Sequence, residues 1–85
     1  MRVLIASALR SYTGSAEVDA SGATLAALLA DLERSYPGIR FRMIDEQGQI
    51  RRHIRFFVDD NEARDLALSL DGRQELIIVQ ALSGG

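Results

Sequence analysis

The hydrophobic pattern is clearest in the segment SGATLAALLADLERSYPG, residues 21–38. Its large apolar side chains recur at helical spacing and form a single stripe: Leu25, Leu28, Leu29, Leu32 and Tyr36. Ser21 or Thr24 is placed to cap the first turn, and Pro37-Gly38 ends the segment because proline disfavours helical geometry at the residue before it. The pattern predicts one amphipathic helix of about three to four turns.

The residues before this helix are typical of a β-hairpin. VLIASALR (Val3–Arg10) opens with β-branched residues, and AEVDA (Ala16–Ala20) follows a polar turn that contains glycine. Two apolar runs separated by such a turn predict a pair of antiparallel strands with a longer loop.

Three further strands are expected after the helix. HIRFFVDD (residues 53–60) alternates in the period of two that marks a strand. A short edge strand is expected around Ala63, and ELIIVQAL (Glu75–Leu82) is apolar on both faces, as a central strand would be. Between helix and strands, Asp45–Gly48 is predicted to be a turn, while residues 39–44 fit a helical turn or extended chain.

This order of elements predicts a two-layer α+β domain. The first and last strands are the most apolar, so they must lie beneath the helix, adjacent and parallel at the centre of the sheet. That architecture is the ubiquitin-like β-grasp, a mixed sheet of four to five strands with one main helix packed on one face. Residues 1–85 are expected to form a single domain.

Strand parity divides the apolar residues between the two sheet faces. If Leu76 and Ile78 point towards the helix, the core also contains Val3, Ile5, Phe56 and Val58. The residues between them face the open side, where they predict an apolar patch that binds a partner protein: Leu4, Phe57, Ile77 and Val79. Leu82, at the end of the last predicted strand, is included in this expected partner surface.

Composition excludes several classes of function. The chain contains no cysteine, which rules out disulfides, thiolate metal sites and a cysteine nucleophile. The net charge of −2 gives nucleic acid no general attraction to the chain. The apolar run near the N-terminus is too short to span a bilayer. We therefore expect a cytoplasmic protein that binds neither nucleic acid nor membrane.

The remaining polar candidates have simple structural interpretations. His53 is the single histidine and is expected to be solvated, and Asp59, Asp60 and Glu62 are residues that turns favour, so no metal site is predicted. Half of the ten basic residues, all of which are arginines, lie within one segment: Arg40, Arg42, Arg51, Arg52 and Arg55. This group indicates a solvated face or, second, a surface for an acidic protein. Because no catalytic motif is present, the chain is not expected to be an independent enzyme.

Taken together, GATLAALLADLERSYPG, FFVDDNEAR and ELIIVQALSGG resemble the MoaD/ThiS family of ubiquitin-like sulfur carriers over essentially the whole chain. LRSYTG and RMIDEQGQIRRHIRFFVDD are most similar to the carriers of cysteine biosynthesis. The small subunit of molybdopterin synthase is the next most similar, although this chain has Gln80-Ala81-Leu82-Ser83 where that branch commonly has a proline.

The resemblance implies a reaction at the C-terminus. The carboxylate of Gly85 would attack the α-phosphate of ATP held by an E1-like adenylating enzyme, and sulfide or a persulfide would then displace AMP to leave a thiocarboxylate. Gly84 gives the chain the small width and backbone freedom needed to enter an active site. The chain itself would bind no cofactor. Residues 83–85 are expected to form a flexible tail, and the sulfur acceptor would be a cysteine synthase-like enzyme or the large subunit of molybdopterin synthase.

Two other functions use the same ending. A ubiquitin-like modifier would be joined through Gly85 to lysines of target proteins, and its activation begins with the same adenylation. Alternatively, the chain is a plain interaction module whose two terminal glycines are incidental.

Overall fold

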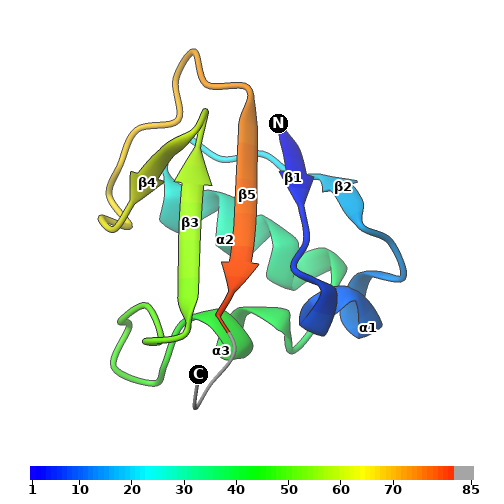
Figure 1. Cartoon of the computed structure of the whole chain (residues 1–85). Helices are drawn as coiled ribbons and strands as arrows, with labels where there is room; N and C mark the ends of the chain where they lie inside the picture. The colour runs from blue at the N-terminus through cyan, green and yellow to red at the C-terminus, as the bar shows by residue number, and fades with distance from the viewer. Residues whose placement is uncertain (82–85) are drawn as a thin grey trace.

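A five-stranded mixed sheet forms the centre of the molecule (Figure 1). The computed structural model describes residues 1–81. The strands lie in the order β2-β1-β5-β3-β4. Their bounds are β1 Arg2–Leu4, β2 Glu17–Asp19, β3 Ile54–Val58, β4 Asn61–Ala63 and β5 Glu75–Gln80, and the helices are α1 Arg10–Thr13, α2 Leu25–Ser35 and α3 Ile39–Met43.

The first and last strands are neighbours at the centre of this sheet. β1 pairs with β5 in parallel, with Val3 opposite Leu76, and β3 pairs antiparallel along the other side of β5. β2 and β4 are the edge strands. This is the predicted β-grasp arrangement, with five strands.

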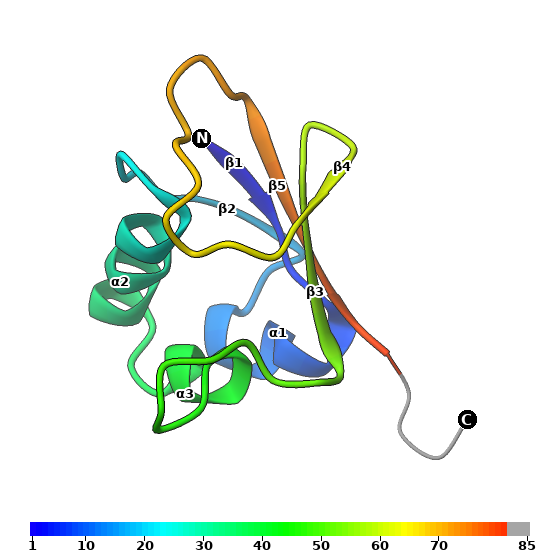
Figure 2. The ribbon, with the colours of Figure 1, turned by 90° about the vertical axis from the view of Figure 1, so that its left-hand side faces the viewer.

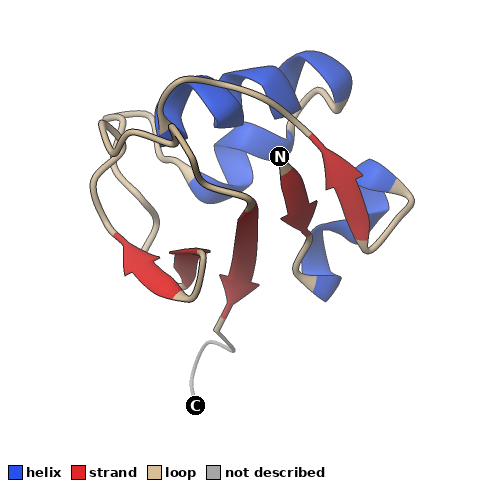
Figure 3. Ribbon diagram, turned by 90° about the horizontal axis from the view of Figure 1, so that it is seen from above, coloured by secondary structure: helices blue, strands red, loops and turns tan. Residues whose placement is uncertain are grey.

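The main helix, α2, covers one face of the sheet (Figures 2 and 3). The four predicted leucines of its apolar stripe are buried, and Tyr36 is partly buried against the core. Of the two candidate caps, Thr24 occupies the N-cap, where its hydroxyl accepts a hydrogen bond from the amide of Ala27 at 3.2 Å. The amides of Leu25 and Ala26 donate to carbonyls of the loop before β5, so this loop completes the helix start.

The expected first strand, Val3–Arg10, was wrong beyond Leu4. The chain turns at Ser7–Leu9 into a 3₁₀ turn and continues as α1, which ends at Gly14 in the left-handed conformation. An extended chain would have put Ser7 on the core face. The helical turn leaves Ser7 exposed and still places Leu9 in the core, where it is 1% exposed.

The segment after α2 adopts the helical alternative of the two that the sequence allowed. It forms α3, whose Ile39 and Met43 are buried. Glu33 of α2 accepts hydrogen bonds from the amides of Gly38 and Arg40, both at 2.9 Å, and so joins the two helices. These amides lower the pKa of the Glu33 carboxyl. The predicted turn at Asp45–Gly48 is confirmed, with the amide of Gly48 donating to the carbonyl of Asp45 at 3.0 Å.

Candidate functional site

The face of the sheet away from α2 carries a row of apolar side chains across its three central strands. Ile77 of β5 lies opposite Leu4 of β1 on one side and opposite Phe57 of β3 on the other. Residues opposite one another share a sheet face, so the three side chains form one band. Val79 lies two residues along β5 on the same face and is 38% exposed.

We call Leu4, Phe57, Ile77 and Val79 the open-face patch. The structure confirms the strand parity on which this patch was predicted. Val3, Phe56, Val58, Leu76 and Ile78 are each no more than 2% exposed on the helix side, whereas the four patch residues keep part of their surface accessible. Leu82, the fifth residue expected here, lies outside the described residues.

The helical segment that the sequence interpretation missed forms one wall of a hollow beside this patch. The hollow, about 320 Å³, is lined by Leu4 and residues 5–8 and 10 on one side, and by residues 77–80 of β5 on the other. Arg10 is fixed there because its Nε donates to the carbonyl of Ile5 at 3.0 Å. The spacing of Ile5, Leu9 and Tyr12, with Gly14 behind them, is a helical signal that could have predicted this wall.

The end of β5 is held firmly as far as the last described residue. β3 pairs with β5 as far as Gln80, whereas β1 pairs only with Glu75–Ile77 at its start. Beyond the strand, the amide of Ala81 donates to the carbonyl of His53 at 2.7 Å. A second hollow of about 320 Å³ at this end is lined by Phe41, Arg42, Arg51, His53 and Gln80, which we call the tail collar. The predicted reactive residues Gly84 and Gly85, and the expected tail 83–85, lie outside the described residues.

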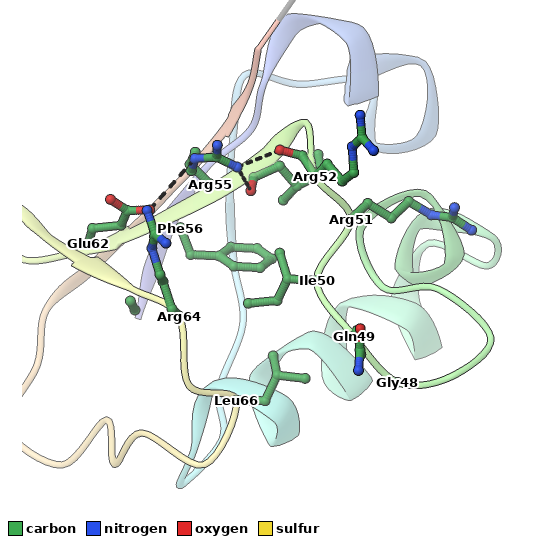
Figure 4. Close-up of a pocket in the computed structure, with 12 residues that line it drawn as sticks. Gly48, Gln49, Ile50, Arg51, Arg52, Arg55, Phe56, Glu62, Arg64 and Leu66 are labelled. Carbon is green, nitrogen blue, oxygen red and sulfur yellow. Dashed lines mark hydrogen bonds and ion pairs between the residues drawn. The ribbon is translucent and has the colours of Figure 1, made fainter. Parts of the chain in front are cut away.

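A larger cleft, about 560 Å³, opens between β3, β4 and the loop before β3 (Figure 4). Phe56, Ile50 and Leu66 form its apolar floor, while Arg55 and Arg64 converge on Glu62. The Nε atoms of the two arginines lie 3.7 and 3.0 Å from the same Glu62 oxygen. The rim of the cleft therefore carries two arginines whose positive charge is partly neutralised by Glu62.

The acidic turn after β3 is structural, as its composition predicted. Asp59 has a positive φ of 46°, which aspartate tolerates better than most residues. Its carboxylate accepts hydrogen bonds from the amides of Gln74 at 3.2 Å and Glu75 at 3.0 Å, which fixes the start of β5.

Within residues 1–81, no group of three or more histidine or acidic side chains is arranged to hold a metal ion. No helix in the same range is long and apolar enough to cross a membrane.

Comparison with known proteins adds a family to this geometry. The sequence model of the ThiS family matches residues 3–85. The chain belongs to the ThiS family. Among curated relatives, the sulfur carrier protein CysO of Mycobacterium tuberculosis (strain ATCC 25618 / H37Rv) is 36% identical over 89 residues, covering 98% of this chain and 96% of the relative.

Solved structures agree with this ThiS-family assignment. A chain in the crystal structure of the Amycolatopsis orientalis BexX/CysO complex superposes with a TM-score of 0.88 at 34% identity, covering 99% of this chain and 98% of that chain. SAMP1 from Haloferax volcanii superposes with a TM-score of 0.80 at 26% identity, covering 100% and 98%. The β-grasp fold of residues 1–81 is therefore shared with these structures.

Proposed function

We propose that this ThiS-family chain is a sulfur carrier that serves cysteine biosynthesis. The observation that carries the proposal is similarity to CysO over 98% of the chain, combined with Gly84 and Gly85 after the central strand β5. The chain acts as a co-substrate and its partners supply the catalytic groups.

The proposed reaction has two steps. The carboxylate of Gly85 attacks the α-phosphate of ATP on an E1-like adenylating enzyme, and pyrophosphate leaves. Sulfide then attacks the acyl carbon of the adenylate, AMP leaves, and a thiocarboxylate remains on Gly85. A thiocarboxylate is ionised and nucleophilic at neutral pH, so the loaded carrier can donate its sulfur to a cysteine synthase-like acceptor enzyme. Because the cycle consumes ATP, we place it in the cytoplasm.

The fold fits this role because the strand that leads to the C-terminus also carries part of the surface that we propose a partner recognises. β5 lies in the middle of the sheet and contributes Ile77 and Val79 to the open-face patch. A partner that binds Phe57 and Ile77 therefore has the end of β5 within the same interface. We propose the patch, including Leu82, as the docking surface for the adenylating enzyme and the acceptor.

Mass spectrometry of the protein isolated from its native host tests the proposal. Replacement of one carboxylate oxygen by sulfur adds about 16 Da to the intact chain. Deleting Gly85, or adding one residue after it, should abolish adenylation without lowering thermal stability. Adenylation of the extended chain without prior trimming would contradict the assignment of Gly85.

The similarity to SAMP1, described as a small archaeal modifier protein in its Methanosarcina acetivorans form, favours protein modification as the second candidate. The chain has no lysine, so it cannot form chains on itself through its own side chains. Gly-Gly remnants on lysines of other proteins would identify a modifier, whereas the mass increase on the free chain would identify a carrier.

A further inference from the structure

The two ends of β5 carry opposite charge. At its start, a hollow is lined by Arg2, Asp59, Asp60, Gln74 and Glu75, which gives three carboxylates against one guanidinium. That guanidinium is already paired with Glu75. At the other end, the tail collar contains the guanidinium groups of Arg42 and Arg51 and no carboxylate. The net charge of −2 does not reveal this difference, because it adds the charges at the two ends of β5 together.

Within residues 1–81, no carboxylate neutralises the collar arginines. In the described part of the chain, neither Arg42 nor Arg51 forms an ion pair with a carboxylate, although four such pairs occur elsewhere. Arg51 is held in place: its Nε donates to the carbonyl of Phe41 at 2.7 Å, and its guanidinium lies 4.5 Å from the centre of the Phe41 ring. Arg51 is also among the residues that line the cleft between β3 and β4, and Figure 4 shows its guanidinium pointing away from that cleft.

Phe41 gives the collar an apolar component. Its side chain is 56% exposed, the largest exposure of any large apolar residue in residues 1–81. An exposed aromatic ring beside cationic groups is a combination enriched in protein interfaces. Arg42, the next residue of α3, is exposed.

The number of residues after β5 limits the distance between the tail collar and a protein that acts on Gly85. Four residues follow Ala81, and an extended chain advances at most about 3.6 Å per residue, or about 14 Å in all. Any protein that acts on the carboxylate of Gly85 must therefore approach the end of β5 closely. The collar then lies inside that interface.

We propose that the tail collar binds carboxylate groups on the surface of the adenylating enzyme, around the opening through which Gly85 enters. This inference rests on the proposed function and names the chemistry of the partner. The acidic hollow at the start of β5 repels the same surface, so the two ends together orient the carrier with its C-terminus towards the enzyme.

Charge reversal at the two ends of β5 tests this proposal. Arg42→Glu lies in the collar, and Arg73→Glu lies in the exposed turn before β5, so both variants change the net charge equally. With the purified adenylating enzyme of the same organism, ATP–pyrophosphate exchange is measured against carrier concentration and NaCl concentration. Circular dichroism melting checks that each variant is folded, and Arg42→Ala serves as the milder second variant.

We expect Arg42→Glu to raise the KM for the carrier about tenfold at low salt and to leave kcat and the KM for ATP unchanged. Arg73→Glu should change the KM less than about twofold, and added NaCl should shrink the difference because it screens exposed charges. Equal behaviour of the two variants would overturn the inference while leaving the carrier function intact. A rise in the KM for ATP would also overturn it, in favour of nucleotide phosphates as the bound group. Absence of exchange with the wild-type chain would instead contradict the proposed function.

Discussion

The covered and open faces of the sheet are built by alternate residues of the same strands. On the covered face, side chains of β3 and β5 meet the leucines of α2 and are almost fully buried. On the open face, Phe57 and Ile77 lie opposite one another with part of their surface exposed. The open face also carries charged residues, since Arg2 and Glu75 share the parity of Leu4 and Ile77, and Arg55 lies opposite Val79. At the centre of the sheet, where both faces are apolar, they differ in whether the protein itself supplies a second layer.

Two pairs of identical neighbours make this contrast unusually direct. Phe56 and Phe57 are adjacent in β3, and Ile77 and Ile78 are adjacent in β5. In each pair one side chain belongs to the core and the other to the open-face patch. Apolar surface left in water adds no stability to the fold, so the second member of each pair supports the docking surface proposed above.

The largest expected effect is a difference in fold stability between alanine variants of the two phenylalanines. Phe56→Ala removes a fully buried ring and should lower the free energy of unfolding by about 3–5 kcal/mol. Phe57→Ala removes a partly buried ring and should cost about 1 kcal/mol. Urea denaturation followed by circular dichroism measures both values. Equal losses would mean that the assignment of the two faces is wrong.

The second effect concerns partner binding, where Phe57 and not Phe56 is expected to matter. If Phe57 anchors the partner, Phe57→Ala should weaken binding to the adenylating enzyme by about 2 kcal/mol. Isothermal titration calorimetry measures this loss, and Val18→Ala, a substitution on the edge strand β2 outside the patch, is the control. Unchanged affinity for Phe57→Ala would remove the open-face patch from the interface.

A third, smaller effect tests how far the covered face depends on the start of its helix. Thr24→Ala removes the side-chain acceptor for the amide of Ala27, which should lower stability by about 1 kcal/mol. Thr24→Ser keeps the hydroxyl and should restore most of the loss in thermal unfolding. Partner affinity should not change, since Thr24 lies on the side of the sheet away from the patch.

The smallest effect concerns pH and again belongs to the helix layer. The amide of Ser21 and the guanidinium of Arg34 lower the pKa of Asp31, and the amides of Gly38 and Arg40 lower that of Glu33. A carboxyl whose pKa is lower in the folded state stabilises the fold above its ordinary pKa, and this contribution is lost as the pH falls through the folded value. Stability should therefore begin to fall below about pH 4.5, the ordinary value for Glu33.

Replacing these carboxylates by amides checks the origin of that acid sensitivity. Asp31→Asn combined with Glu33→Gln should flatten the dependence of the melting temperature on pH in the acid range. Glu46→Gln, in the exposed turn before β3, is the matched control. An unchanged acid slope in the double variant would exclude these two hydrogen-bonded carboxylates as its source.

Local sequence patterns predicted the two faces well because their signals are periodic. The leucine stripe of α2 and the alternation in β3 each fix which side chains are buried, and the parallel pairing of β1 with β5 followed from the need to cover both. The segment after Leu4 was not predicted because its β-branched start masked the helical spacing of Ile5, Leu9 and Tyr12. The tail collar was predicted only in part. The sequence grouped Arg42 and Arg51 as a solvated face or a surface for an acidic protein, but only folding brings them together with Gln80.

The pairing of β5 on both sides has a mechanical consequence. A partner that draws the C-terminal residues into its active site pulls β5 along its own axis. Under that direction of force, the hydrogen bonds to β1 and β3 are sheared together, whereas an edge strand pulled sideways would be peeled away one bond at a time. The sheet thus behaves as a clamp on β5, and tension applied to the end of the chain is spread over the whole ladder before any part of the core opens.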